Sequence, residues 1–406
     1  MSLIPADNAL ACVAALFVIA ACGFLMEKTR IGALLTGAVW AILFAILASN
    51  LPLPVWVDGQ FGLHPLIPQS SSGYSFVFRY FVPVLIPLFL MKADLKKIFF
   101  ETTRMTGAFI LASIGTVLGA IVAFSLISVG DKTAAAAGVF TATYIGGSVN
   151  YAALIEVTGL GESDPSFVSS ATAVDNLFSG LFLAVLAILP GVSWIANRFV
   201  KRDHSEDTGA TNSAEASAAG EEANTTGKIT AASLTYSIAF AMIVVVIGDL
   251  LTAGLTSLVG DAGGNWRYAL ITVVALIPAT AFPKTMAKLH GGYEIGIALS
   301  FVFFAAIAAG ADVVSLVADA PLLILIIGIL LSVHGVVTFG LGSLLRLSLP
   351  ELITASNAAI LGATTAPALA AAKGWKDLVT PGVLVGVFGY ALGTIIATAV
   401  YQFWPG

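Results

Sequence analysis

The chain has 406 residues, of which 58% are hydrophobic and 10% are charged, and its mean hydropathy is +0.97. A water-soluble domain cannot carry so much apolar surface without aggregating, so this composition indicates an integral membrane protein in contact with the lipid bilayer. The net charge is −5, and no basic patch with interleaved aromatic residues is present, so we expect no nucleic-acid partner.

Apolar runs of membrane-spanning length follow one another along the chain. Most exceed the roughly 18 residues that separate a spanning helix from a core helix, and they lack the alternating pattern of an outer-membrane barrel. The sequence therefore predicts an all-α polytopic membrane protein with about 11 to 13 transmembrane helices, and an interfacial loop at residues 50–72. The predicted spans are residues 8–26, 31–49, 73–92, 105–129, 133–157, 166–192, 229–250, 267–284, 293–311, 320–343, 351–372 and 378–402.

The first run, residues 8–26, contains a stretch from Ile19 to Cys22 that resembles a lipoprotein signal, but no lysine or arginine precedes the run as such a signal requires. We therefore expect it to be retained as the first helix. Because no other targeting segment is visible, we expect insertion into the cytoplasmic (inner) membrane of a bacterium.

A polar segment at residues 203–228 separates the sixth span from the seventh. It is rich in Ser, Thr, Ala, Gly and acidic residues and has almost no large apolar ones, which is typical of a disordered linker. The sequence therefore predicts a first membrane repeat at residues 1–202 and a second at residues 229–406.

The two halves share an order of features. Each has a run that ends in Ala-Asp, then a span, then a segment rich in Ser, Thr, Gly and Asn, then a final span. This order predicts two structural repeats, although the basic loops do not fix how many crossings separate them. An offset of 215 residues aligns Gly147 with Gly362, Ala153 with Ala368, Leu154 with Leu369 and Gly159 with Gly374.

The fifth span contains an unusual cluster, TATYIGGSVN, between Thr141 and Asn150. Two adjacent glycines each lower helix stability by about 1 kcal/mol relative to alanine, and in lipid every freed backbone group must find another partner. The cluster therefore predicts a broken helix, whose half-helix ends present backbone dipoles to an ion or an anionic group.

The eleventh span repeats this pattern with hydroxyl, amide and glycine residues and one proline. Its members are Thr354, Ser356, Asn357, Gly362, Thr364, Thr365 and Pro367. Small residues that merely permit close helix packing are the alternative explanation. Packing accounts for the glycines but not for the two asparagines and the many hydroxyls.

The pair Asp175-Asn176 lies inside the sixth span. A carboxylate inside a membrane helix costs about 3 kcal/mol or more, so Asp175 is the first candidate for a proton-linked or sodium-linked group. Asn176 offers a neutral oxygen beside it, and hard cations prefer oxygen ligands, so a sodium ion at this pair is a specific expectation. A carboxylate that caps or bridges neighbouring helices is the alternative.

These clusters define two sets of candidate residues. The residues expected to couple transport to an ion are Asp175, Asn176, Thr141, Thr143 and Asn150. The residues expected to bind the substrate are Gly146, Gly147, Ser148, Ser356, Asn357, Gly362, Thr364 and Thr365.

Other polar residues of the spans are weaker candidates. His334 lies deep in its span, where a hydrogen bond between helices is favoured over a proton relay. Glu294 and Glu351 lie near predicted span ends, where solvated or helix-terminal roles are favoured.

Enzyme signatures are absent from the sequence: there is no HExxH, GxSxG, paired CxxC or P-loop motif, and the four histidines are scattered. The chain is therefore expected not to be an enzyme, and to need no cofactor beyond a coupling Na⁺ or H⁺. An ATP-driven pump would need a soluble nucleotide-binding region, which the short polar segment cannot supply.

Several stretches resemble the membrane protein family known as domain-of-unknown-function family 819. They are FVPVLIPLFLMKADLKKIF (81–99), TATYIGGSVNYAAL, ATAVDNLFSGLF, FVFFAAIAAGADV and TASNAAILGATTAPALAAAKGW. The resemblance covers nearly the whole chain apart from the polar segment. That family looks distantly related to the superfamily of cation:proton antiporters and anion transporters.

The resemblance implies two inverted repeats, each with a discontinuous helix, and a mobile core that moves by an elevator mechanism, often in a homodimer. In the antiporters an acidic pair or an Asn-Asp pair follows the first broken helix, and Asp175-Asn176 occupies that location in the reverse order. No basic residue lies clearly within the tenth span, so the cationic partner of some antiporters is missing.

The sequence therefore predicts a secondary active transporter that moves a small solute, with a small organic anion favoured, coupled to sodium or protons. A monovalent cation/proton antiporter is the alternative if Asp175 is the main ligand. A membrane-embedded sensor or scaffold, or a channel, is the alternative from another class. A sensor normally adds a folded soluble domain, and a channel conducts much faster than a transporter.

Overall fold

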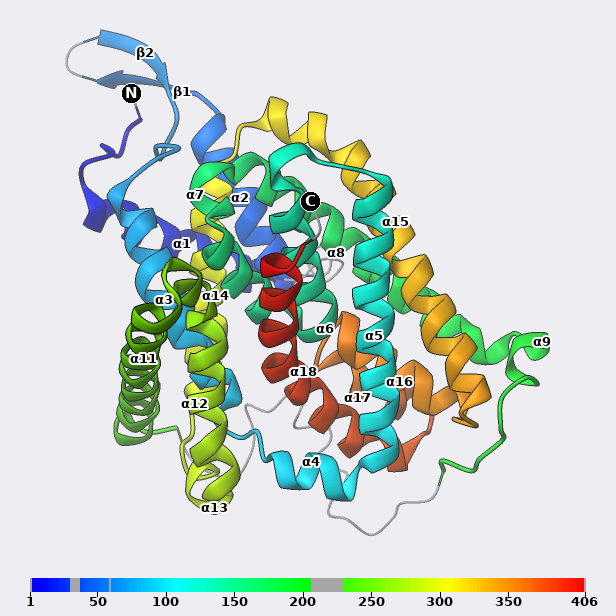
Figure 1. Ribbon diagram of the computed structural model, residues 1–406. Helices are drawn as coiled ribbons and strands as arrows, with labels where there is room; N and C mark the ends of the chain where they lie inside the picture. Colours follow the sequence, from blue (N-terminus) through cyan, green and yellow to red (C-terminus); the bar gives the residue numbers. More distant parts are fainter. Residues whose placement is uncertain (1, 30–36, 58–59, 206–228, 405–406) are drawn as a thin grey trace. The chain divides into compact units, whose positions relative to one another are not determined.

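The computed structural model in Figure 1 describes residues 2–29, 37–57, 60–205 and 229–404. Helices dominate these residues. The one sheet among them is a two-stranded antiparallel hairpin of β1 (Leu53–Val57) and β2 (Gln60–His64), which pairs Leu53 with His64. It forms within the segment 50–72, where the sequence predicted an interfacial loop.

The helices follow the predicted spans closely along the chain. Their bounds are α1 Ala9–Glu27, α2 Gly37–Asn50, α3 Ser72–Leu90, α4 Leu95–Glu101, α5 Thr103–Leu126, α6 Thr133–Thr158, α7 Leu160–Ser163, α8 Pro165–Ile188, α9 Ser193–Ala196, α11 Ala231–Val259, α12 Arg267–Ala281, α13 Pro283–Met286, α14 Gly292–Ala309, α15 Val313–Leu344, α16 Leu349–Ile360, α17 Thr365–Ala372 and α18 Lys376–Gln402. Short 3-10 turns occur at Gly130–Lys132, Leu189–Gly191 and Asp261–Trp266.

Eight of the described helices are long and apolar enough to cross a membrane, which identifies a multi-pass membrane protein. They are α1, α3, α5, α8, α11, α14, α15 and α18. The other four predicted spans contain helices among the described residues, of which α12 is short and α6 and α16–α17 are interrupted. Residues 31–36 of the predicted span 31–49 lie outside the described residues, which resume at the first residue of α2. The expected 11 to 13 crossings therefore depend on how these four segments traverse the bilayer.

The chain forms two compact units that do not follow the order of the predicted repeats. Unit 1 contains Met1–Leu85, Thr158–Leu177 and Ile295–Leu325, and unit 2 contains Ile86–Val157, Phe178–Glu294 and Ile326–Gly406. Of the predicted linker 203–228, only residues 203–205 lie within the described part of the chain. The two-repeat division remains a prediction.

Unit 1 is held by aromatic contacts and by side chains that satisfy helix ends. Phe24 stacks on Phe301 with ring centroids 4.1 Å apart. The Asn50 side chain donates to the carbonyl of Ala311 at 2.8 Å. Such bonds matter in a membrane protein because a helix end without water must find its partners within the protein.

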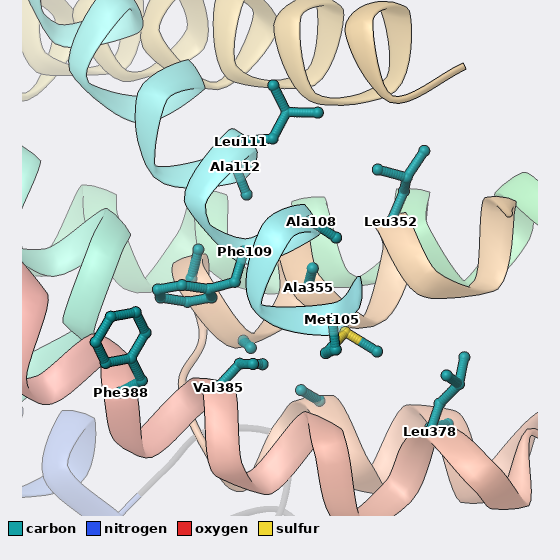
Figure 2. Close-up of a cluster of buried hydrophobic side chains, with 14 of the residues drawn as sticks. Met105, Ala108, Phe109, Leu111, Ala112, Leu352, Ala355, Leu378, Val385 and Phe388 are labelled. Carbon is teal, nitrogen blue, oxygen red and sulfur yellow. The ribbon is translucent and has the colours of Figure 1, made fainter. Parts of the chain in front are cut away.

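Unit 2 has an alanine-rich core between α5, α16 and α18 (Figure 2). Phe109 on α5 and Phe388 on α18 pack with ring centroids 5.9 Å apart, while Ala355 on α16 lies in the same cluster. The small residues let the helices approach closely, as membrane helix packing requires. A Cβ atom added at Gly386 of α18 would lie 2.7 Å from the backbone nitrogen of Ala363. Helix α18 therefore packs directly against the segment between α16 and α17.

We expect Gly386→Ala to lower the midpoint of thermal unfolding in detergent. The added methyl group would overlap the backbone at Ala363, and overpacking of this kind costs about 1–3 kcal/mol. Gly335→Ala in α15 is the matched control, because a Cβ there meets no atom within 4 Å and alanine favours the helix by about 1 kcal/mol. A Gly386→Ala protein as stable as the control would contradict this packing.

Candidate functional site

The first break lies in α6 at Gly147, whose φ of 68° and ψ of −164° are not helical. This left-handed φ is readily adopted by glycine and is strained for other residues. The helix is buried on both sides of the break, whereas Ser148 directly after it is exposed. The glycine pair therefore breaks the helix as the sequence predicts, and Ser148 is the accessible hydroxyl beside the break.

The second break separates α16, which ends at Ile360, from α17, which begins at Thr365. Gly362 within it has a φ of 93°. The buried side chain of Asn357 spans the interruption: its amide donates to the carbonyl of Thr365 at 3.2 Å, and its oxygen accepts from the Thr365 hydroxyl at 2.7 Å. Asn357 thus supplies hydrogen bonds across the break, which the surrounding lipid cannot provide.

Asn150 plays a related part after the first break. Its amide donates to the carbonyl of Gly389 on α18 at 3.0 Å, and its oxygen accepts from the Thr394 hydroxyl at 2.7 Å. A Cβ at Gly389 would lie 2.5 Å from the carbonyl oxygen of Ile145. Close packing therefore explains some glycines here, while the asparagine holds α6 against α18 by hydrogen bonds.

Tyr390 of α18 meets both breaks. A Cβ at Gly147 would lie 3.9 Å from its Cε1 atom, and a Cβ at Gly362 would lie 3.8 Å from its hydroxyl oxygen. The side chain is only 9% exposed, and its ring lies 5.7 Å from that of Phe89 between centroids. The two broken segments therefore converge on a single aromatic side chain within unit 2.

Sequence reasoning missed Tyr390, because an aromatic residue in an apolar span has no distinctive pattern. One signal could have found it. The offset of 215 residues that aligns Gly147 with Gly362 also aligns Asp175 with Tyr390. Asp175, the first ion-coupling candidate of the first half, thus corresponds to Tyr390, on which the two broken segments converge.

His334 of α15 connects the elements around the two breaks. Its Nδ1 lies 2.9 Å from the hydroxyl of Thr116 on α5, and its Nε2 lies 2.8 Å from the hydroxyl of Ser356 on α16. The Thr116 hydroxyl donates in turn to the carbonyl of Tyr144 on α6 at 2.9 Å. A neutral His334 ring with its proton on Nδ1 satisfies all three hydrogen bonds. The Thr116 hydroxyl then accepts from Nδ1, and the Ser356 hydroxyl donates to Nε2. The expected hydrogen bond between helices is present at His334.

Glu351 anchors the beginning of α16. It is 4% exposed, forms a capping box with Ser348, and accepts from Arg104 at 2.9 Å and from Arg202 at 3.0 Å. The helix-terminal role expected for Glu351 is therefore confirmed. Arg202 immediately precedes the predicted linker, so this ion pair fixes the end of the first half to the second broken segment.

Two threonine hydroxyls on the broken segments are buried without a hydrogen-bond partner among the described residues. They belong to Thr141 on α6, which is 0% exposed, and Thr354 on α16, which is 1% exposed. Buried hydroxyls are normally satisfied, so each has capacity for a further hydrogen bond to water, an ion or a solute. Thr141 is one of the residues predicted to couple an ion.

The remaining predicted residues divide between the units. Asp175 and Asn176 lie on α8 in unit 1, where Asp175 is half-buried and the Asn176 amide donates to the carbonyl of Thr172 at 2.8 Å. Thr143 is buried on α6, and Thr364 lines a cavity of about 150 Å³ together with Tyr390. All predicted residues of the two broken segments belong to unit 2, and the part of Asp175 and Asn176 in ion coupling stays a prediction.

The sequence is similar to a known family and to a bacterial protein over nearly its whole length. Residues 14–404, which include both broken segments, match the family described as "Protein of unknown function (DUF819)". The protein of Bacillus subtilis (strain 168) named "Uncharacterized membrane protein YjcL" is 30% identical over 391 residues. That similarity covers 92% of this chain and 91% of the Bacillus protein.

We expect His334→Leu to destabilise the protein, because the Ser356 hydroxyl would lose its buried partner. A buried polar group left unsatisfied costs about 1–3 kcal/mol. The measurement is thermal unfolding in detergent, with Ser332→Ala on the exposed side of the same helix as control.

A double-mutant cycle sharpens this test. Ser356→Ala combined with His334→Leu should cost clearly less than the sum of the single changes, because both remove the same hydrogen bond. Additive losses would show that the two side chains do not interact.

Proposed function

The chain is a membrane protein that belongs to the DUF819 family, and we propose that it is a secondary active transporter that moves a small solute across the membrane. The observation that carries the proposal is the convergence of two helix breaks on Tyr390. Broken helices that meet inside a membrane unit present backbone dipoles and hydroxyls to a solute without burying full charges. A helix that serves only as a membrane anchor has no need of such a site.

The positive-φ glycines support a pair of structural repeats behind this site. Gly147 and Gly362 have φ values of 68° and 93°, and Gly159 and Gly374 have values of 69° and 75°. Both pairs are related by the offset of 215 residues found in the sequence. Equivalent backbone turns at equivalent positions are what two copies of one ancestral half would retain.

The placement of both breaks in unit 2 supports an elevator mechanism. In such a mechanism the two broken segments travel together as one body, so they must belong to the same packed unit. Asn150 joins α6 to α18 by hydrogen bonds, and Gly386 packs α18 against the second break. The two segments are therefore linked through one helix.

The coupling ion is proposed to bind through Asp175, with Asn176 beside it on α8 as a further oxygen donor. In unit 2, the Thr141 hydroxyl is buried without a hydrogen-bond partner among the described residues, so we propose it as an oxygen donor to an ion at the first broken segment. The amide of Asn150 is engaged with Gly389 and Thr394, so its part is to hold α6 in place rather than to bind the ion directly.

The coupling proposal predicts that sodium or protons stabilise the protein through Asp175. A ligand that binds only the folded state adds about 2.7 kcal/mol of stability at a hundredfold excess over its Kd. We expect the thermal midpoint of the full chain to depend on NaCl, relative to choline chloride, or on pH, and Asp175→Asn to abolish that dependence. Glu162→Gln, an exposed acid near the start of α8, is the control. An unchanged dependence in Asp175→Asn would remove this residue from the mechanism.

Transport itself is measured in proteoliposomes that contain the full chain. An imposed inward sodium or proton gradient should accelerate saturable uptake of at least one member of a panel of radiolabelled carboxylates and amino acids. A cation/proton antiporter would instead dissipate a pH gradient when NaCl or KCl is added, without any organic solute. If folded protein gives neither of these two responses, the transporter proposal is refuted.

A further inference from the structure

We propose that the cavity beside the second break binds a small zwitterion with a compact aliphatic body, as in an amino acid with an aliphatic side chain. The inference rests on the proposed function, because it names the solute class of the same site. It replaces the small organic anion that the sequence favoured with a solute that carries both charges.

The cavity lies within unit 2 and has a volume of about 150 Å³. Ala363 and Thr364 bring the second break into its wall, and Tyr390 brings in the side chain on which both breaks converge. A cavity of this volume is large enough for a benzene-sized apolar group. A ligand bound here would contact the second break and Tyr390.

Two side chains of opposite charge, Lys92 and Glu294, contribute to the same cavity wall. Each has an ordinary structural role as well: Lys92 belongs to a basic loop, and Glu294 lies in the first turn of α14, where the helix dipole favours an acid. These roles explain why each charge is tolerated. These separate roles do not explain why Lys92 and Glu294 line the same cavity beside a helix break.

The mixed charge of the wall selects between ligand classes. A plain organic anion would be attracted by Lys92 but repelled by Glu294, and a plain organic cation would be attracted by Glu294 but repelled by Lys92. A zwitterion satisfies both, with its carboxylate toward Lys92 and its ammonium group toward Glu294. The hydroxyls of Thr364 and Tyr390 add hydrogen-bonding groups in the same wall.

The rest of the wall fits an aliphatic body. Phe89, Val383, Leu384 and Val387 contribute to it, and burial of a leucine-sized side chain is worth about 1.5–3 kcal/mol. Phe89 also packs on Tyr293 with ring centroids 5.3 Å apart and nearly perpendicular planes. The apolar side of the cavity is therefore held in shape by aromatic contacts that include Tyr390.

The test compares three probes of nearly the same skeleton on the full chain in detergent. L-leucine carries both charges, 4-methyl-2-oxopentanoate lacks the ammonium group, and isopentylamine lacks the carboxylate. We expect L-leucine to raise the thermal midpoint saturably, and the other two to bind at least tenfold more weakly. Equal affinity for the oxo acid and leucine would overturn the zwitterion, as would the lack of any shift with leucine.

Single-residue variants test which side chain binds each charged group of leucine. Glu294→Gln should weaken leucine binding at least tenfold while reducing the preference over the oxo acid, and Lys92→Met should reduce the preference over the amine. Lys97→Gln, an exposed lysine on α4 that does not line the cavity, should leave leucine binding unchanged. Each variant's thermal midpoint without ligand reports whether it folds. Unchanged leucine affinity in folded Glu294→Gln would overturn the assignment.

Uptake separates this inference from the transporter proposal. Leucine that binds but does not enter proteoliposomes would leave the cavity assignment intact and contradict transport of leucine. Gradient-driven uptake of another solute, without leucine binding, would support transport and contradict the zwitterion site.

Discussion

The structure depends on one constraint: a helix that is interrupted in apolar surroundings must find hydrogen bonds for its backbone within the protein. Asn357 meets this need at the second break by bonding to both the carbonyl and the hydroxyl of Thr365. Asn150 ties the first broken helix to a carbonyl of α18. Asn357 is therefore part of what makes the second break tolerable, while Asn150 holds the first broken helix against α18.

Helix α18 brings the two broken segments together. Its glycines allow the backbone of α6 and the segment before α17 to approach closely, and Tyr390 lies among these glycines, with the first break near its ring and the second near its hydroxyl. On the other side, His334 joins Thr116 and Ser356 into a buried hydrogen-bonded chain. Packing and hydrogen bonding thus both hold the two broken segments together. Motion of one broken segment within unit 2 would disturb the other.

The helices and both breaks could be predicted from the sequence because they follow from local properties. Apolar length specifies a span, and the Gly146-Gly147 pair or Gly362 weakens a helix wherever it stands. The contact of Tyr390 with Gly147 and that of His334 with Thr116 could not be predicted, since each joins residues more than two hundred positions apart through helix packing. Glu294 illustrates the same limit: its sequence position indicates a helix end, while only the fold brings it into a cavity with Lys92.

The proposed transport requires that the two breaks become accessible from each side of the membrane in turn, and cysteine labelling tests this most directly. Ser148→Cys and Thr364→Cys place one thiol beside each break, after Cys12 and Cys22 are replaced by serine. We expect a membrane-impermeant maleimide to label each thiol from both faces, in right-side-out and in inside-out vesicles, whereas Lys284→Cys on the short helix α13 reacts from one face only. Labelling of both break positions from a single face, with and without sodium, would contradict a transporter.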